Sequence, residues 1–419
     1  MSDKQAKPRF FYGYVIVTAS FFVWMVAWGI SQSFGVFFKP LLAEFGWGRA
    51  ETVLAVSLSS IIQALLAIIM GLLTDRLGPR LVVAGFGSCL GIAFLLMSHV
   101  NSLWQFYLYY ALAAIGFSTA STPIMATAAR WFIKKRTLMT GIVQAGVGIG
   151  GFIFAPFTGW LILNYGWRNG YTVLGIISLV CIIAAGLVIR RDPRDMGQLP
   201  DGASETTAPT EPKHKVSTQA TGFSLREALS ANQFWIIAGL FFSFGFCRST
   251  FLPHIAAHVQ DLGFSLADGA NVVAILTVSS ILGRLWMGWL SNRTAFMISF
   301  GVTTLALVWG LITGDLWGLY LFAVIFGFGW GAQAVLRFTT TAETFGLASV
   351  GLIMGVFVFA EAGASAFGSY FGGYVFDAFG SYQLAFYVGI ALSIAGIILA
   401  WQLKPITLLK KANVTRTSK

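Results

Sequence analysis

Long runs of apolar residues, separated by short polar stretches, dominate the chain. A helix that spans a bilayer needs about 20 mostly apolar residues, and about twelve segments fit by length and flanks. We expect the first six spans at 14–38, 52–73, 81–98, 103–128, 138–163 and 171–189. We expect the second six at 234–258, 268–290, 296–313, 316–341, 349–376 and 382–403. The pattern therefore predicts an all-α membrane protein.

A short motif occurs twice, about half the chain apart. Residues 71–76 (GLLTDR) match residues 288–293 (GWLSNR) in type and order. Transporters are commonly built from such repeats, with the binding site near the middle of the membrane where the repeats meet. We therefore predict two six-helix bundles, at 1–190 and 233–419, joined by a cytoplasmic linker at 191–232.

The linker has a composition that cannot bury a core. It combines prolines with Ser, Thr, Asp, Glu and Lys, so we expect it to be mostly disordered. One short segment differs, because Ser224 can cap a helix whose third residue, Glu227, reaches back to the cap. We expect a short helix there, just before the seventh span.

Composition and charge agree with a membrane protein. Charged residues make up 10% of the chain and hydrophobic residues 57%, whereas a soluble protein has about 25% charged residues. The formal net charge is +11, but the basic residues lie at the ends of apolar spans, where they mark the cytoplasmic side. We predict a monomeric, multi-pass inner-membrane protein in contact with the lipid bilayer. Both termini are expected in the cytoplasm, and no nucleic-acid partner is expected.

Residues for other chemistries do not occur at usable spacing. The three cysteines, Cys89, Cys181 and Cys247, lie within apolar spans and form neither a disulfide framework nor a metal-ligand pattern. The sequence has no pair of acids and no Ser/His arrangement at a spacing that would indicate catalysis. We expect no enzyme activity, no metal, no cofactor and no cleaved signal segment.

Arg284 stands inside an apolar span. An arginine at that position costs at least about 2.5–3.5 kcal/mol, and more if it faces lipid. It must therefore face a wet cavity, a partner or an anion. One interpretation is a structural arginine that pairs with another helix or extends to the nearby interface. The other is a fixed positive charge that binds an anionic substrate.

The most specific motif is GLLTDRLGPR in the first half. Within it, Asp75 can meet a helix N-terminus or an arginine, while Arg76 and Arg80 stay at the cytoplasmic surface. The motif is either a tight loop with solvated charges or a latch that holds one conformation closed. It resembles the signature of the major facilitator superfamily, which implies the major facilitator fold. The second copy ends at Arg293 and has Asn292 in place of the acid, so a latch there should be weaker.

Further segments carry a closer resemblance. They are 12–17 (YGYVIV), 34–39 (FGVFFK), 130–136 (RWFIKKR) followed by Gly141 and 145–146 (AG), and 283–284 (GR). These segments resemble the monocarboxylate transporters, most closely the bacterial members near the oxalate/formate antiporter group. The resemblance covers both halves of the chain. It implies transport of small monocarboxylates such as lactate or pyruvate, often with a proton.

The resemblance also implies site residues. Arg284 matches the substrate-binding arginine of the family's eighth span, and His254 resembles a histidine that lines the pocket in bacterial members. Ser280 and Gln32 stand where animal members carry an acid and a lysine that serve proton coupling, so that pair is absent. Both can still hydrogen-bond a carboxylate or hydroxyl, and Gln144 is a weaker candidate for the pocket.

Glu361 is the remaining candidate for carrying a proton. If it is buried away from cations, its carboxyl favours the protonated form. It can instead be a neutral, hydrogen-bonded residue or a partner of Arg337. His254 is the second candidate for proton coupling. Arg248, a further cation inside a span, is either an extra anion contact or a partner of Glu361.

We therefore expect a secondary active transporter of small monocarboxylates that works by alternating access. Its expected partners are the small organic anion and a proton. The alternatives are an organic-anion exchanger without proton coupling, an efflux carrier of another substrate, and a membrane sensor with a carrier fold.

Overall fold

The computed structural model describes residues 11–202, 223–287, 290–346 and 350–403, and in these ranges the regular elements are helices. Eleven of the described helices are long and apolar enough to cross a membrane. One of them belongs to α7 (Arg136–Val188), whose 53 residues would measure about 80 Å, far more than one bilayer crossing of about 30 Å. Gly166 interrupts α7 with φ 81° and ψ 159°, so this stretch supplies two spans. The prediction of an all-α protein with about twelve spans is confirmed.

The described chain forms two compact units. Unit 1 contains residues up to Ser31, Ile62–Phe154 and the chain from Asn164 to the linker, and unit 2 contains the rest. Residues 32–61 and 155–163 therefore group with the second-half helices. The boundaries predicted on either side of 191–232 stay a prediction.

Unit 1 is built from the helices of the first half. It contains most of α1 (Gly13–Gln32), the second part of α3 (Arg49–Leu77), α4 (Pro79–Leu81), the π-helix η1 (Val82–Phe86), α5 (Gly87–Met97), α6 (Leu103–Trp131) and most of α7. The helix α5 packs on α6. Two short 3-10 turns, η2 (Pro193–Met196) and η3 (Pro200–Gly202), follow α7.

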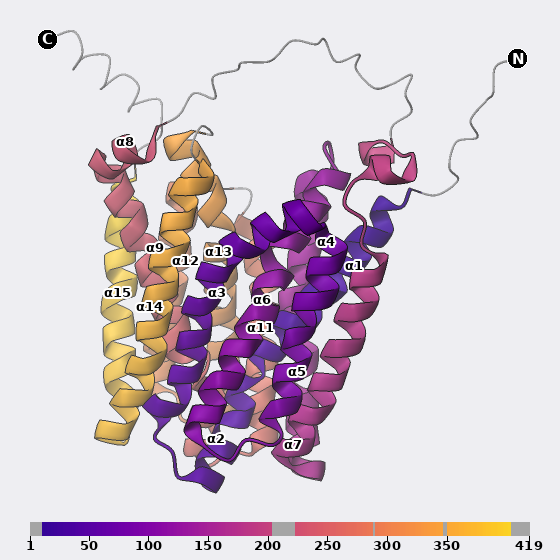
Figure 1. Cartoon of the computed structure of the whole chain (residues 1–419). Coiled ribbons are helices and arrows are strands. Elements are labelled where there is room, and N and C mark those ends of the chain that lie inside the picture. The colour runs from indigo at the N-terminus through magenta and orange to yellow at the C-terminus, as the bar shows by residue number, and fades with distance from the viewer. Residues whose placement is uncertain (1–10, 203–222, 288–289, 347–349, 404–419) are drawn as a thin grey trace, which may run out of the picture. The chain divides into compact units, whose positions relative to one another are not determined.

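Unit 2 holds the second-half helices. They are α8 (Leu225–Ser230), α9 (Asn232–Phe251), α10 (Ile255–Asp261), α11 (Leu266–Met287), α12 (Asn292–Ile312), α13 (Leu316–Phe345), α14 (Val350–Phe379) and α15 (Gln383–Trp401). The unit also includes α2 (Phe34–Phe45), which packs on α10 and α11, and the first part of α3. Figure 1 shows α9 beside α14 and α15, which it contacts.

The closest helix pair in unit 2 is α11 with α13. A side chain at Gly283 would collide with the backbone oxygen of Phe328, and one at Gly331 would collide with that of Ser280. Small residues that let two backbones meet are the usual way to join helices in lipid, where apolar side chains gain little from contacting each other. This contact fixes α11 on α13 at the level of Arg284.

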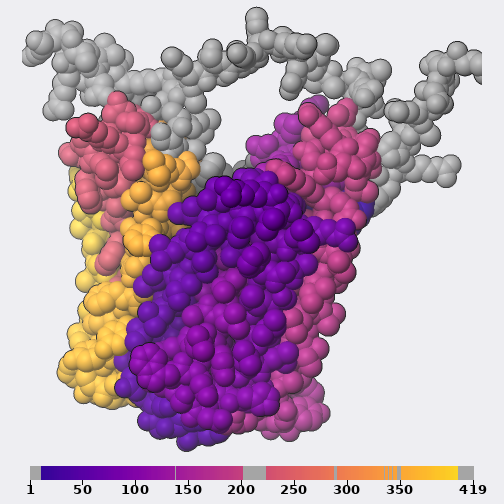
Figure 2. Space-filling view, viewed as in Figure 1, coloured from indigo at the N-terminus to yellow at the C-terminus, as the bar shows by residue number. Residues whose placement is uncertain are grey.

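Large apolar side chains are exposed along the spans. Ile68, Leu108 and Leu285 are 65–68% exposed, which would be a liability in water but suits contact with lipid tails. Figure 2 shows the outer face of the helices coloured indigo and violet in space-filling form.

Near the linker, the predicted helix is present as α8. The Ser224 hydroxyl accepts a hydrogen bond from the Glu227 backbone, and the Glu227 carboxylate accepts one from Ser224. The prediction of a disordered linker falls largely on residues 203–222, outside the described residues. The basic residues at 1–10 and 404–419 and the start of the second motif, 288–289, also lie outside them.

Candidate functional site

Three arginines and one glutamate from four helices gather inside unit 2. They are Arg248 on α9, Arg284 on α11, Arg337 on α13 and Glu361 on α14, and we call them the arginine cluster. Nη1 of Arg337 lies 2.8 Å from Oε2 and 3.0 Å from Oε1 of Glu361. Arg248 interacts electrostatically with both members of this pair, and Arg284 with both other arginines. The cluster therefore contains the cation predicted from the sequence together with two more.

Helix packing determines where these side chains lie. On α9, Gly245 lets the backbone approach Glu361 so closely that a Cβ there would be 2.7 Å from the Glu361 carbonyl oxygen. Arg248 follows three residues later, on the same side of α9. Because α11 is held against α13 by its glycine contact, Arg284 lies near Trp330, with its Cζ 5.7 Å from the ring centroid. That geometry is a cation–π contact.

The arginine cluster has an excess of positive charge. It contains three guanidinium groups, which stay protonated in proteins, and one carboxylate. Cations inside a membrane protein are costly and face a cavity or a partner. The arrangement is therefore suited to binding an anion.

Glu361 is buried, as expected, but it is not remote from cations. Its side chain is 9% exposed and that of Arg337 is 31% exposed. Of the alternatives that the sequence left open for Glu361, the structure shows the partner of Arg337. Glu361 is therefore not buried away from cations, because an arginine contacts both of its carboxylate oxygens.

His254 lies in a different place, at the start of α10. Its Nε2 is 3.0 Å from the Ser369 carbonyl oxygen, so Nε2 carries the proton, and Nδ1 accepts from the Tyr382 hydroxyl at 3.3 Å. The rings of Phe38 and His254 form a T-shaped contact, with their centroids 5.3 Å apart. Both ring nitrogens thus have protein partners, and the structure groups His254 with these residues rather than with the arginine cluster.

Beside His254 is an ion-pair network that sequence reasoning missed, and we call it the junction cluster: Lys39, Arg49, Asp261, Asp377 and Tyr382. Two nitrogens of Arg49 meet the two oxygens of Asp261 at 2.7 and 2.9 Å, and Lys39 meets Asp261 at 2.7 Å. Arg49 also donates to the Tyr382 hydroxyl at 2.6 Å. Asp377 accepts from the Arg49 backbone N–H at 3.0 Å, at the start of α3. These charges give no local signal, because their partners are far apart in the sequence.

The junction cluster lowers the pKa of the acid at its centre, Asp261. Burial alone would raise the pKa of Asp261, but hydrogen bonds and charge from Arg49 and Lys39 hold the pKa below its ordinary value. Asp261 is therefore an anion across the physiological pH range.

The other predicted pocket residues, Ser280, Gln32 and Gln144, belong to three different helices. The Ser280 hydroxyl is buried and donates to the Thr277 carbonyl of its own helix at 2.7 Å. Ser280 stands one turn before Arg284, on the same side of α11. Gln32 is buried at the end of α1, and Gln144 is half-buried on α7 in unit 1. Their part in binding stays a prediction.

The predicted latch residues lie at helix ends. Asp75 meets Arg130 of α6 at 2.7 Å in an exposed ion pair, while Arg76 and Arg80 are exposed. In the second copy, the Asn292 amide donates to the Glu343 carboxylate at 2.6 Å. Arg293 is exposed, with its Cζ 6.0 Å from the Trp401 ring centroid. The second motif thus has Asn292 where the first has Asp75, and the acid that Asn292 contacts is Glu343 on α13.

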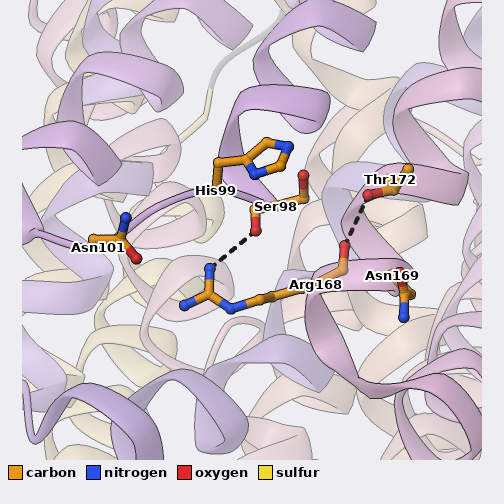
Figure 3. Close-up of a pocket in the computed structure, with 6 residues that line it drawn as sticks. All are labelled: Ser98, His99, Asn101, Arg168, Asn169 and Thr172. Atoms are coloured by element: carbon orange, nitrogen blue, oxygen red, sulfur yellow. Dashed lines mark hydrogen bonds between the residues drawn. The ribbon is translucent and has the colours of Figure 1, made fainter.

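A small pocket in unit 1 surrounds Arg168, whose hydrogen bonds have a structural role. Figure 3 shows Arg168 directed at the chain that follows α5, where it donates to the carbonyl oxygens of Ser98 and Val100 at 3.0 and 3.1 Å. The pocket is lined by Ser98, His99, Asn101, Arg168, Asn169 and Thr172. Because this arginine satisfies carbonyls at a helix end, it needs no ligand.

Comparison with known proteins gives concordant results. A family model described as the Major Facilitator Superfamily matches residues 14–369. Monocarboxylate transporter 13 of Rattus norvegicus is 29% identical over 410 residues, covering 94% of this chain and 90% of that protein. The oxalate:formate antiporter of Oxalobacter formigenes is 27% identical over 401 residues, covering 94% and 90%. A bacterial homologue of the human lysosomal transporter Spinster, in an inward-facing and unoccupied conformation, has a TM-score of 0.73 at 16% identity and covers 95% of this chain and 96% of its own. The last likeness concerns the fold alone.

Proposed function

Because the chain belongs to the Major Facilitator Superfamily, we propose that it carries small organic anions across the inner membrane by alternating access. Like its relatives, it is a transporter and not an enzyme. The first candidate substrates are monocarboxylates such as lactate or pyruvate, carried together with a proton. The basic residues that flank the spans support cytoplasmic termini in this proposal.

The observation that carries this proposal is the excess positive charge of the arginine cluster. Arg284 binds the substrate carboxylate, since the planar fork of a guanidinium matches two carboxylate oxygens better than an ammonium does. Trp330 stabilises the same guanidinium from its ring face. In this assignment, Ser280, one turn away, is close enough along the helix to orient the substrate's second polar group.

Proton coupling is assigned to the Arg337–Glu361 pair. When Glu361 is protonated it no longer neutralises Arg337, so the cluster gains attraction for an anion. Binding of the anion and binding of the proton then favour each other, as reciprocity requires. Ser280 and Gln32 cannot take this role, because neither side chain titrates near neutral pH.

A second candidate function is anion exchange without protons. It is favoured by the contact of both Glu361 oxygens with Arg337, since a carboxylate that stays ion-paired carries no proton. In that case the arginine cluster alone recognises the anions.

Uptake by proteoliposomes tests the proposal. A panel of labelled monocarboxylates, dicarboxylates, amino acids and sugars is offered with and without an inward proton gradient. We expect uptake of carboxylates alone, faster with the gradient. Uptake that depends on a trapped internal carboxylate but ignores the gradient would favour exchange. Uptake of uncharged sugars instead would refute an anion carrier.

A further inference from the structure

We propose that the start of the linker, residues 189–202, is a strap docked on unit 1, and that Asp201 is the residue that holds it there. We call these residues the strap. The strap ties the ends of α1, α6 and α7 together, so that unit 1 moves as one body during transport. The docking can be measured without a substrate, whereas its effect on the transport rate rests on the proposed function.

Two hydrogen bonds attach the middle of the strap to helix ends of unit 1. The indole N–H of Trp131, the last residue of α6, donates to the Arg190 carbonyl oxygen at 3.0 Å. The backbone N–H of Tyr12, directly before α1, donates to the side-chain oxygen of Gln198 at 3.0 Å. The strap therefore contacts two helix ends before the chain reaches Asp201.

Asp201 makes the third attachment, to the loop between α6 and α7. Its Oδ2 accepts from the backbone N–H groups of Ile133 at 2.9 Å and Lys134 at 2.7 Å, and its Oδ1 accepts from that of Lys135 at 3.4 Å. Hydrogen bonds from backbone N–H groups to a carboxylate are among the stronger ones. Partial burial alone would raise the pKa of Asp201, but these bonds and the charge of Lys134 hold the pKa below its ordinary value. Asp201 is therefore an anion at neutral pH.

The backbone of Asp201 has a conformation that favours glycine. Its φ is 57° and its ψ is 11°, and among the described residues it is the only one other than glycine with a positive φ. Aspartate tolerates this conformation better than most residues, but glycine adopts it more easily still. A residue held in this region needs compensation from its surroundings. The hydrogen bonds of the carboxylate supply that compensation, which indicates that the side chain matters here and not only the turn.

The linker is also attached at its other described end, in unit 2. The backbone N–H of Phe223 donates to the carbonyl oxygen of Phe345 at 2.8 Å, and the two rings form a T-shaped contact with their centroids 6.0 Å apart. Phe345 is the last residue of α13, and the repeated motif aligns α13 with α6. The linker is therefore attached at matching places in the two units, at the ends of equivalent helices.

A purely local role for Asp201, as a cap of the turn in which it stands, is the competing explanation. A local cap would shape residues 200–202 and leave transport unchanged. A strap that holds three helix ends together affects the conformational step of transport, which sets the maximal rate in many carriers and enzymes, and it does so without touching the substrate. The two explanations therefore differ in the transport rate.

Hydrogen–deuterium exchange of the full-length purified protein tests the docking. We expect the amides of 133–135 to be protected in wild type although their side chains are exposed. Asp201→Asn keeps the size but loses the charge, and Asp201→Gly keeps the turn but loses the carboxylate. Protection in both should fall about tenfold or more, the size of one charged hydrogen bond. The control is Asp315→Asn, an exposed aspartate that accepts from the Gly318 backbone N–H, and it should keep the wild-type protection.

Unprotected amides at 133–135 in wild type, or wild-type protection in both Asp201 variants, would overturn the docking. The first of these results needs no variant, so it decides the matter even where a variant folds poorly.

Carboxylate uptake by proteoliposomes, with the same variants, tests the effect on transport. We expect both Asp201 variants to have a maximal rate several-fold below that of wild type with unchanged substrate affinity, and Asp315→Asn to have the wild-type rate. Lost protection together with a wild-type rate would make Asp201 a local cap, and a loss confined to affinity would place its effect at the binding site; either result overturns the strap. If wild type takes up no carboxylate, the proposed function fails and the exchange experiment still decides the docking.

Discussion

At the scale of single residues, the chemistry of the site rests on which charges are compensated. In the arginine cluster, Glu361 contacts Arg337 directly, and Arg284 is the residue to which we assign the anion. In the junction cluster, Asp261 is matched by both Arg49 and Lys39. The first arrangement is suited to binding, and the second holds protein segments together.

Glu361→Gln tests the proton assignment. The amide keeps the shape of the protonated carboxyl but cannot titrate, so we expect acceleration of uptake by an inward proton gradient to disappear. Counterflow exchange of labelled substrate should continue, because the arginines remain. Substrate-driven proton movement is recorded in proteoliposomes for wild type and variant. Proton movement that persists in the variant would move the assignment to His254.

Asp261→Asn tests the electrostatics of the junction cluster. Because the folded pKa of Asp261 is lowered, its stabilisation is complete above the ordinary pKa and is lost only as pH falls through the folded value. The Tm difference between wild type and variant should therefore stay constant from about pH 8 to about pH 5 and narrow only in stronger acid. The titratable groups that interact with Asp261 include Arg49 on α3, Lys39 on α2, His258 on α10, His254 and Tyr382. A difference that changes near neutral pH would assign the titration to one of the two histidines.

At the scale of elements, the end of α3 is joined to the end of α6 by one exposed pair, Asp75 with Arg130. Exposed pairs contribute about 0–1 kcal/mol, so Asp75→Asn should change the transport rate by a few-fold at most and spare substrate affinity. Arg130→Gln should have the same effect, and the double variant should be no slower than either, because all three remove one interaction. Arg194→Gln, at an exposed position after α7 and outside the motif, is the control. Independent, additive slowing would contradict a latch made by this pair.

How far the sequence predicted these elements depends on the range of the interactions. The α8 cap was predictable because Ser224 and Glu227 are neighbours along one turn. The partner of Glu361 was named as an alternative, since both residues stand inside apolar spans and buried charges seek opposite ones. The junction cluster was missed because Arg49 and Asp261 come from different halves of the chain and each resembles an ordinary charge at a span end. His254 was expected in the binding site because of the family resemblance. Its ring nitrogens contact Ser369 and Tyr382, and its part in binding stays a prediction.

At the scale of the whole molecule, the basic residues are the basis of the topology that we propose. An even number of spans would leave both ends of the chain on one side of the membrane, which we propose is the cytoplasm. Cysteines introduced at Ser217 and Ser418, in a variant lacking the three native cysteines, should resist an impermeant thiol reagent in intact cells and react after the cells are opened. A cysteine at Trp47, between α2 and α3, is the opposite-side control and should react in intact cells. Labelling of positions 217 and 418 from outside would reverse the orientation.

The central claim is that Arg284 binds the carboxylate of an organic anion. Titration calorimetry of the purified protein with the best carboxylate from the uptake panel tests it directly, using wild type, Arg284→Lys, Arg284→Ala and the exposed control Arg293→Ala. A charged hydrogen bond contributes about 1.5–3 kcal/mol, so we expect the affinity to fall by about tenfold or more in Arg284→Lys, further in Arg284→Ala, and to be unchanged in the control. Wild-type affinity in Arg284→Ala would contradict the claim and assign the anion to Arg248.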